Sequence, residues 1–250
     1  MYKYQLNNNF LALKDFLLNI QEHFEHNTKT IHKARNEIKI IEFETQKYVV
    51  KSFKVPSTLK AMYYTQFDSK AKRSYEYSLK LGDLVPEPVG YIEYYNANKL
   101  QESFYISRYF AYDWTMKEVL RDEVFTNREE LLKAFARFSA ALHNQGVLHL
   151  DYSAGNILIK KDSDDTYTFK IVDLNRMKFK ENLSPSKRMK NFDMLWAKKE
   201  HLIIIAKEYA RISNLDAHEA TKKILYYAFK LKLIKNFKKL LKGRVKNIDW

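Results

Sequence analysis

The sequence of 250 residues lacks cysteine, which excludes disulfide bonds, thiolate metal sites and cysteine nucleophiles. Only 5 residues are glycine, where average usage would give roughly 18, and the chain contains no low-complexity linker and no internal repeat. Uninterrupted apolar runs are short: residues 202–206 are typical, whereas a membrane-spanning helix needs about 20 apolar residues. Residues 1–9 are polar and lack the pattern of a signal peptide, so we expect a cytoplasmic protein.

The composition is that of a globular and strongly basic protein. Hydrophobic residues make up 46% of the chain and aromatic residues 15%, enough to form the core of one or two domains. The 44 Lys and Arg residues exceed the 30 Asp and Glu residues by 14, which favours partners that carry phosphate, such as nucleotides, nucleic acids or anionic lipids. Residues 222–250 contain ten Lys and Arg residues and one acidic residue, so more than half of the net charge lies in this segment.

The N-terminal part is predicted to combine a sheet with two helices. Apolar residues three and four positions apart predict a helix over residues 10–24. β-Branched and aromatic residues predict a hairpin over residues 38–50 and two further strands at residues 91–95 and 103–110. A second helix is expected over residues 69–81, between the hairpin and the later strands.

The C-terminal part is predicted to be mostly helical, with short strands around one polar loop. We therefore place a domain boundary near residues 108–113, with an N-terminal lobe of residues 1–110 and a C-terminal lobe of residues 111–250. The expected elements of the C-terminal lobe are helices at 115–120, at 127–145 and from residue 185 onward, and strands at 147–150, 156–159 and 169–174.

The polar loop carries a motif with a known chemistry. Residues 148–156 read Leu-His-Leu-Asp-Tyr-Ser-Ala-Gly-Asn, and residues 170–175 read Lys-Ile-Val-Asp-Leu-Asn. The pattern H-x-D-x-x-x-x-N, followed by a strand that ends in Asp, is typical of the catalytic loop and metal-binding Asp of protein-kinase-like phosphotransferases. Phosphoryl transfer needs a carboxylate that orients the attacking hydroxyl, which is the role predicted for Asp151. It also needs oxygen ligands for Mg²⁺ beside the phosphates of ATP, which is the role predicted for Asn156 and Asp173.

An upstream strand supplies a candidate phosphate ligand. Residues 48–53, Tyr-Val-Val-Lys-Ser-Phe, are similar to the V-A-I-K strand of kinases, so Lys51 is the candidate that binds the α- and β-phosphates, and Glu76 is the candidate that holds Lys51 in place. A glycine-rich phosphate loop is absent, since residues 28–38 contain no glycine. If this segment covers the phosphates, Lys33 and Arg35 are the cations expected to replace part of the usual backbone contacts.

Several segments together resemble one particular family, the bacterial lipopolysaccharide inner-core kinases of the Kdo/heptose kinase family. The resemblance extends over roughly residues 10–200. The segments that carry it are Arg-Asn-Glu-Ile-Lys at 35–39, Ser-Lys-Ala-Lys-Arg-Ser-Tyr-Glu-Tyr-Ser-Leu-Lys-Leu at 69–81, Pro-Glu-Pro-Val-Gly-Tyr-Ile-Glu at 86–93 and Asp-Leu-Asn-Arg-Met-Lys-Phe at 173–179.

This resemblance implies an α+β, two-lobed protein-kinase-like fold with a sheet-rich N-terminal lobe and a helical C-terminal lobe. It also implies ATP and Mg²⁺ as cofactors, and transfer of the γ-phosphate to a sugar hydroxyl of the lipid A inner core at the cytoplasmic face of the inner membrane. The chain departs from the kinase pattern in two places: the missing glycines, and Asn175 where D-F-G has its glycine.

Other interpretations of the same residues remain open. Asp151 and Asn156 also suit an ordinary turn, His149 suits a buried scaffold better than a proton carrier, and Glu76 suits a pair along its own helix. A protein kinase is disfavoured because only 77 residues follow Asp173 and none of them form an A-P-E element. A small-molecule phosphotransferase of the aminoglycoside or choline type would be expected to be less basic. The intact set of predicted catalytic residues disfavours a non-catalytic binding module, and we expect no nucleic-acid partner.

The basic C-terminal segment also allows two interpretations. Apolar residues recur every three or four positions from Ile224 to Ile248, while most of the lysines lie elsewhere on the predicted helix. The helix is either packed on the core with a solvated basic face, or it is an amphipathic helix that contacts anionic membrane headgroups or a phosphorylated glycolipid.

Overall fold

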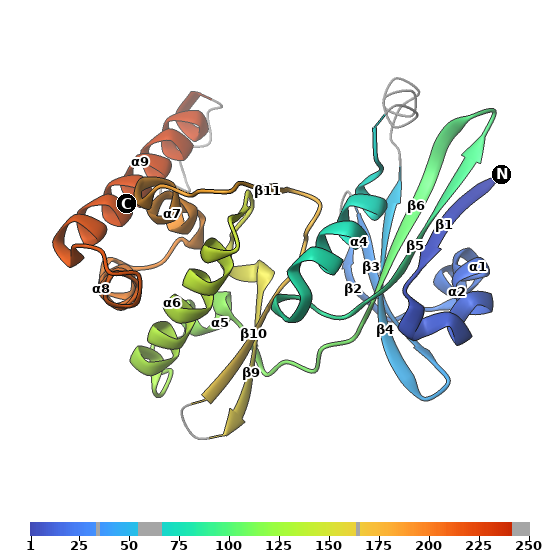
Figure 1. Cartoon of the computed structure of the whole chain (residues 1–250), viewed down its shortest axis with the longest axis horizontal. Helices are drawn as coiled ribbons and strands as arrows, with labels where there is room; N and C mark the ends of the chain where they lie inside the picture. The colour runs from blue at the N-terminus through green and yellow to red at the C-terminus, as the bar shows by residue number, and fades with distance from the viewer. Residues whose placement is uncertain (34–35, 55–66, 164–165, 242–250) are drawn as a thin grey trace. The chain divides into compact units, whose positions relative to one another are not determined.

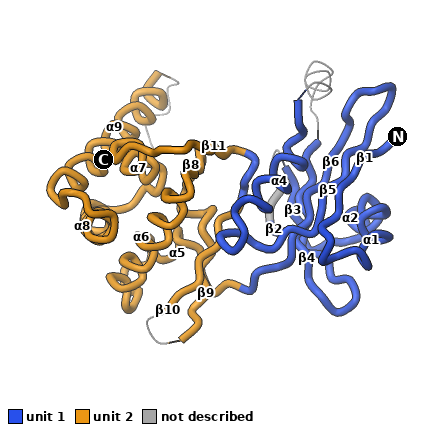
Figure 2. The backbone as a smooth tube through the Cα atoms, in the orientation of Figure 1, with its two compact units in different colours: residues 1–111, 173–175 blue, residues 112–172, 176–250 orange. Residues whose placement is uncertain are grey.

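The computed structural model describes residues 1–33, 36–54, 67–163 and 166–241, which form two compact units (Figures 1 and 2). Unit 1 comprises Met1–Ala111 and the short segment Asp173–Asn175. Unit 2 comprises Tyr112–Val172 and the chain from Arg176 onward. The fold is α+β, as predicted, with an antiparallel sheet in unit 1 and mostly helices in unit 2.

Unit 1 is built on a six-stranded antiparallel sheet with the strand order β1–β5–β6–β4–β3–β2. Helices α1 and α2 cover one face of this sheet and helix α4 covers the other (Figure 1). The elements are β1 (Tyr2–Leu6), η1 (Asn8–Leu13), α1 (Lys14–Leu18), α2 (Ile20–His26), β2 (Thr30–Lys33), β3 (Glu37–Phe43), β4 (Gln46–Lys54), α4 (Lys70–Leu81), η2 (Gly82–Leu84), β5 (Pro88–Asn96) and β6 (Lys99–Arg108).

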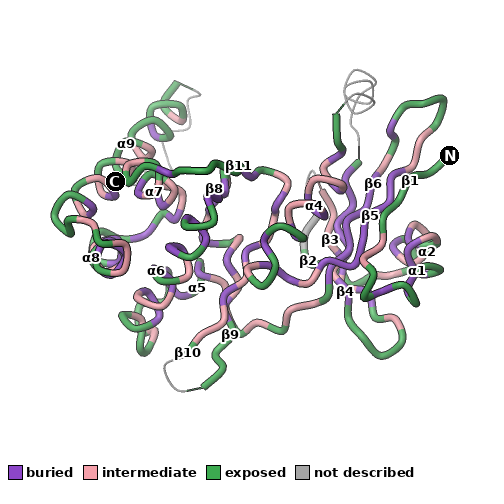
Figure 3. Tube along the Cα trace, viewed as in Figure 1, coloured by how far each residue is buried: buried purple, intermediate pink, exposed green. Residues whose placement is uncertain are grey.

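The alternation of side chains along β4 decides where Lys51 lies. Tyr48 and Val50 are buried in the cluster beneath α1 and α2, whereas Phe53 is buried in the cluster that includes Tyr75 of α4. Because successive side chains of a strand point to opposite faces, Lys51 shares the face of Phe53. Its ammonium lies 5.3 Å from the centre of the Phe53 ring. Buried residues follow the central strands β4 and β6, as Figure 3 shows.

The predicted helix over residues 10–24 is wrong as one continuous helix, although its apolar side is correct. Phe10, Leu17 and Phe24 are all buried in one cluster with the sheet. The helical turns are divided among η1, α1 and α2, because Phe10 has non-helical backbone angles (φ −127°, ψ 27°) and Asn19 separates α1 from α2. The amide of Asn19 donates to the Asp15 carbonyl, so its side chain competes for the backbone of this helical end.

Other elements of unit 1 agree with the sequence or were missed by it. The predicted helix 69–81 is confirmed as α4, and the Ser69 hydroxyl caps its start by accepting from the Lys72 amide. Strand β1 was not predicted. Its residues are largely exposed at the edge of the sheet, where Tyr4 pairs with Ile92 of β5. Tyr2, Tyr4 and Leu6 alternate with Lys3 and Gln5, and this short pattern was the sequence signal for the strand.

Unit 2 packs its helices around a core that includes two small sheets. Strand β7 pairs with the β9–β10 hairpin, and β8 pairs with β11. None of the helices in the described ranges is long and apolar enough to span a membrane. The elements are β7 (Trp114–Thr115), α5 (Met116–Arg121), α6 (Arg128–Asn144), β8 (Val147–His149), η3 (Ala154–Asn156), β9 (Ile157–Ser163), β10 (Thr166–Ile171), β11 (Met177–Phe179), α7 (Pro185–Lys190), η4 (Asn191–Leu195), α8 (Lys199–Ile212) and α9 (Ala217–Leu241).

Candidate active site

The loop between β8 and β9 in unit 2 holds Asp151, and His149 fixes its backbone. The Asp151 amide donates to Nδ1 of His149 (3.0 Å), so the other ring nitrogen, Nε2, donates to the Val172 carbonyl (2.9 Å). The imidazole is fully buried. His149 therefore ties the loop to the end of the strand that precedes Asp173, and this geometry supports the scaffold interpretation of the residue.

Asn156 closes the same loop with its side-chain amide. Its Nδ2 donates to the Asp151 carbonyl (2.9 Å), and that carbonyl also accepts from the Ser153 amide (2.7 Å). The backbone carbonyl of Asn156 accepts from the Val172 amide (3.0 Å). Because Nδ2 is engaged with the loop, Oδ1 is the atom of Asn156 that suits a hard cation such as Mg²⁺.

Arg176 lies beside Asp151 and was not predicted as a site residue. Its guanidinium Nη1 lies 3.8 Å from Oδ2 of Asp151, and its side chain is 61% exposed. Its backbone carbonyl accepts from the Leu150 amide (2.8 Å), which connects β11 to the start of the loop. The sequence signal for Arg176 is its place in the segment at 173–179 that resembles the Kdo/heptose kinase family, where no general rule of phosphoryl transfer assigns it a role.

In unit 1, Lys51 and Asp173 form a close ion pair across 122 positions of sequence. Nζ of Lys51 lies 2.5 Å from Oδ1 of Asp173, and the two side chains are 11% and 29% exposed. The Asn175 amide donates to the same oxygen (2.6 Å). Both hydrogen bonds found for Asp173 among the described residues use Oδ1, so Oδ2 is the oxygen best placed to bind a cation.

The backbone around Asp173 explains why the chain does without a glycine at position 175. The left-handed conformation in this segment falls on Asp173, whose φ is 62°, whereas Asn175 is not among the described residues with positive φ. Position 175 therefore does not require the conformational freedom of glycine. Its side chain instead orients the Asp173 carboxylate, a contact that the sequence did not predict.

Three further residues were predicted for the nucleotide site: Glu76, Lys33 and Arg35. Glu76 lies 3.7 Å from the ammonium of Lys72 on its own helix, so its role as partner of Lys51 stays a prediction. Lys33 ends β2, with its backbone opposite Glu37 of β3. Arg35 lies outside the described residues. The described part of the chain contains no cluster of three or more His, Asp or Glu side chains suited to a metal.

A chain of hydrogen bonds through His143 supports the loop that holds Asp151. The Asn191 amide donates to the His149 carbonyl (2.8 Å), and its oxygen contacts Nε2 of His143 (3.1 Å). Nδ1 of His143 in turn contacts the Tyr209 hydroxyl of α8 (2.9 Å). Burial lowers the pKa of His143 to about 4, against the hydrogen bond to Asn191, with the charge of Arg188 acting in the same direction as burial. The ring is therefore neutral at pH 7 and donates from Nε2 to Asn191.

Comparisons with known proteins identify the family and the fold. The model of the lipopolysaccharide kinase (Kdo/WaaP) family matches residues 57–219, a range that includes Asp151, Asn156 and Asp173 and begins after Lys51. A solved structure of WaaP in complex with acyl carrier protein matches with a TM-score of 0.62 at 18% sequence identity, covering 92% of this chain and 99% of that chain. No match was found among curated protein sequences. The shared fold is the kinase-like α+β fold. Because the family model spans well over half of its length, the chain belongs to the lipopolysaccharide kinase (Kdo/WaaP) family and is a phosphotransferase.

Proposed function

We propose that this lipopolysaccharide kinase uses ATP and Mg²⁺ to phosphorylate a sugar hydroxyl of the lipopolysaccharide inner core, on a Kdo or heptose residue. The observation that carries the proposal is the ion pair between Lys51 and Asp173, which joins the predicted phosphate ligand to the predicted metal ligand. Two residues 122 positions apart come within 2.5 Å of each other, an arrangement that an isolated turn or surface charge would not require.

Each residue has a defined task in this reaction. Lys51 binds the α- and β-phosphates, and Oδ1 of Asn156 with Oδ2 of Asp173 would hold Mg²⁺. Asp151 orients the sugar hydroxyl and accepts its proton as the oxygen bonds to the γ-phosphorus and the bond to the β-phosphate oxygen breaks, releasing ADP. When bound, Mg²⁺ neutralises charge on the phosphate oxygens. The protein contributes mainly position and electrostatic stabilisation.

The test is transfer of label from [γ-³²P]ATP to four separate samples: inner-core glycolipid, free Kdo, a generic protein, and no acceptor. We expect label on the glycolipid, dependence on Mg²⁺, and a loss of at least about a hundredfold for Asp151→Asn. Label on the generic protein alone would contradict the proposal and identify the activity as that of a protein kinase. Label on free Kdo but not on glycolipid would indicate a small-molecule kinase, and transfer that survives Asp151→Asn would remove Asp151 from catalysis.

The predicted roles of Glu76 and Arg35 need their own tests. If Glu76 positions Lys51 in the nucleotide complex, Glu76→Gln lowers kcat/KM for ATP by about tenfold, the cost of one charge-assisted hydrogen bond. Lys72→Gln is the matched control, because it removes the surface partner that Glu76 has in the structure. If the segment of residues 28–38 covers the phosphates, Arg35→Ala should raise KM for ATP. An unchanged KM would exclude Arg35 from phosphate binding.

A further inference from the structure

Helix α9 has apolar residues on two sides, and only one side is packed. Ala220, Ile224 and Ala228 are buried, and the Tyr227 hydroxyl hydrogen-bonds to Ser186 of α7 (2.6 Å). The apolar repeat predicted from the sequence is therefore not one continuous stripe. Ile224 packs on the core of unit 2, whereas Phe237 of the same repeat is 62% exposed.

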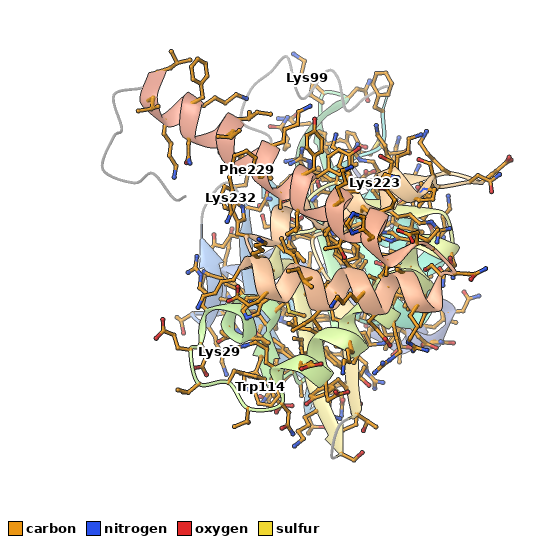
Figure 4. All side chains as sticks on the ribbon, turned by 90° about the vertical axis from the view of Figure 1, so that its left-hand side faces the viewer. Lys29, Lys99, Trp114, Lys223, Phe229 and Lys232 are labelled. Atoms are coloured by element: carbon orange, nitrogen blue, oxygen red, sulfur yellow. The ribbon has the colours of Figure 1, made fainter. Side chains whose placement is uncertain are left out.

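The other side of α9 exposes large apolar side chains along its length. They follow one another at helical spacings of three and four, so they share one side of the helix. Phe229 is 58% exposed and Leu241 72% exposed, and Figure 4 looks directly onto this helix. We call this set the α9 stripe; its residues are Tyr226, Phe229, Leu233, Ile234, Phe237, Leu240 and Leu241.

Lysines accompany the stripe. Residues 217–241 contain seven lysines and one glutamate, a net charge of +6 without His218. Lys223 and Lys230 lie three and four positions from Tyr226, and the Lys230 ammonium is 5.7 Å from the centre of the Tyr226 ring. Lys232 lies further round the helix, between Phe229 and Lys235 in sequence (Figure 4). At 3.6 residues per turn, Lys222, Lys223 and Lys230 share the side of the stripe, whereas Lys232, Lys235, Lys238 and Lys239 lie on other sides of the helix. The first half of the helix thus presents apolar side chains and ammonium groups on one side.

We propose that the α9 stripe rests on the surface of an anionic lipid bilayer. A bilayer surface is the partner that matches both chemistries at once, because the Phe and Leu side chains reach the boundary of the acyl chains while the ammonium groups meet lipid phosphates. The proposal rests on the proposed function, since a lipid-borne sugar acceptor is held at such a surface.

A nucleic acid, a second copy of the chain and a neutral protein groove would each match only half of the surface. A nucleic acid would engage the lysines but leave Phe229 and Phe237 in water. A second copy of the chain would cover the apolar side chains but place Lys223 and Lys230 near the lysines of the other copy, and like charges across an interface are costly. A neutral protein groove would leave the lysines without partners.

The test measures binding of the full-length protein to sedimented vesicles in the absence of nucleotide. One set of vesicles is phosphatidylcholine alone and the other contains about a third phosphatidylglycerol. We expect binding to the anionic vesicles only, weakening as salt is raised from 0.1 to 0.5 M because the charge attraction is screened. The variant Phe229→Glu/Phe237→Glu should bind at least about tenfold more weakly, since it removes two apolar anchors and adds two negative charges.

Matched controls separate this surface from general stickiness and from catalysis. Val124→Glu changes an apolar residue that is 84% exposed but lies outside α9, and it should bind like the parent protein. Asp151→Asn should also bind normally, because vesicle binding does not use the catalytic residue. Circular dichroism of each variant confirms that the exposed substitutions leave the fold intact.

Each remaining outcome decides against the proposal. Equal binding of the parent and the Phe229→Glu/Phe237→Glu variant, or equal binding to neutral vesicles, removes the anionic bilayer as the partner. Loss of vesicle binding on addition of tRNA, with vesicles unable to displace the tRNA, assigns the surface to nucleic acid. A concentration-dependent dimer that the double variant abolishes assigns it to a second copy. None of these results depends on whether phosphoryl transfer occurs, so failure of this proposal is distinct from failure of the proposed function.

Discussion

At the scale of single residues, Arg176 is a candidate contact for the acceptor of the proposed reaction. A general base must come within hydrogen-bond distance of the hydroxyl that it deprotonates. Since the guanidinium lies 3.8 Å from Oδ2 of Asp151 and is largely exposed, an acceptor deprotonated by Asp151 would also come within reach of Arg176. Arginine binds phosphate and carboxylate groups through two parallel hydrogen bonds.

We therefore predict that Arg176→Ala raises KM for the glycolipid acceptor by about tenfold, the loss expected for a charge-assisted hydrogen bond, and leaves KM for ATP unchanged. Steady-state kinetics with each substrate varied in turn measures both constants. Lys178→Ala is the control, because Lys178 is an exposed cation on β11, two residues after Arg176. An equal rise in KM for both substrates would show that Arg176 acts on the nucleotide or on the whole loop instead.

At the scale of elements, the catalytic loop depends on a segment 42 residues away. Asn191 opens η4 and connects the His149 carbonyl to the buried His143. We predict that Asn191→Ala lowers kcat by roughly tenfold, with KM for ATP unchanged, because the hydrogen bond that holds the His149 backbone, two residues before Asp151, is lost while no ligand contact is removed. Asn191→Asp should be impaired to a similar degree, since it keeps an acceptor for His143 but cannot donate to His149.

The matched control is Asn144→Ala on α6. The Asn144 side chain accepts from Arg188 at 2.7 Å, so its removal also breaks a side-chain hydrogen bond. Unlike Asn191, Asn144 does not bond to the loop itself among the described residues and reaches it only through Arg188, Tyr209 and His143. If Asn144→Ala and Asn191→Ala lowered kcat equally, the effect would be general destabilisation and the positioning role of Asn191 would be rejected. Thermal unfolding of both variants measures how far each substitution lowers the unfolding temperature, so that the two losses of stability can be compared.

The same buried chain makes stability depend on pH. Burial lowers the pKa of His143 from 6.5 to about 4, so the unfolded chain takes up this proton at a higher pH than the folded protein does. Above about pH 6.5, His143 therefore causes no change of the free energy of unfolding with pH. This free energy falls as the pH drops from 6.5 to 4, by about 3 kcal/mol in total.

Urea unfolding from pH 7.5 to 4 tests this prediction. His143→Gln should be less stable than the parent at pH 7.5, but the difference should shrink on acidification because the variant has no proton to take up. His201, whose pKa burial also lowers, is present in both proteins and cancels in the difference. His218→Gln on the exposed start of α9 should leave the pH dependence of the parent unchanged. If the free energy of unfolding changed with pH equally in the parent and in His143→Gln, the lowered pKa of His143 would be contradicted.

The sequence could predict those parts of the fold and site that depend on local spacing. The Ser69 cap and the apolar side of residues 70–81 lie within a few turns of one another, so α4 was correctly predicted. The residues Asp151, Asn156 and Asp173 follow a fixed motif. Asn191 and Arg176 contact segments that only folding brings together, so no local spacing assigns them a role, although Arg176 lies within the family segment at 173–179. Strand β1 was missed although Tyr2, Tyr4 and Leu6 alternate with polar residues, because the pattern is only five residues long and its side chains are largely exposed.

At the scale of the whole molecule, the chain returns to unit 1 for only three residues after it has entered unit 2. The segment Asp173–Asn175 belongs with unit 1, while Val172 and Arg176 on either side belong with unit 2. The segment Asp173–Asn175 contacts the rest of unit 1 through the ion pair between Asp173 and Lys51. The Lys51 side chain is nearly buried, so its charge depends on the carboxylate of Asp173, which lies 122 positions later in the sequence.

A double-mutant cycle on Lys51→Met and Asp173→Asn measures this dependence through urea unfolding at pH 7 without nucleotide. We expect a coupling energy of about 1–2 kcal/mol, because Asp173→Asn alone leaves a poorly hydrated ammonium without its counter-charge, and the double variant no longer has an ammonium to satisfy. The value lies below that of a fully buried pair, since the Asp173 side chain is 29% exposed. The control cycle uses Lys72 and Asp68, which lie 2.7 Å apart at the solvated start of α4 and should couple by less than about 0.5 kcal/mol. Equal coupling in the two cycles would mean that the Lys51 contact is no stronger than a surface pair, and the proposed function would lose the observation that carries it.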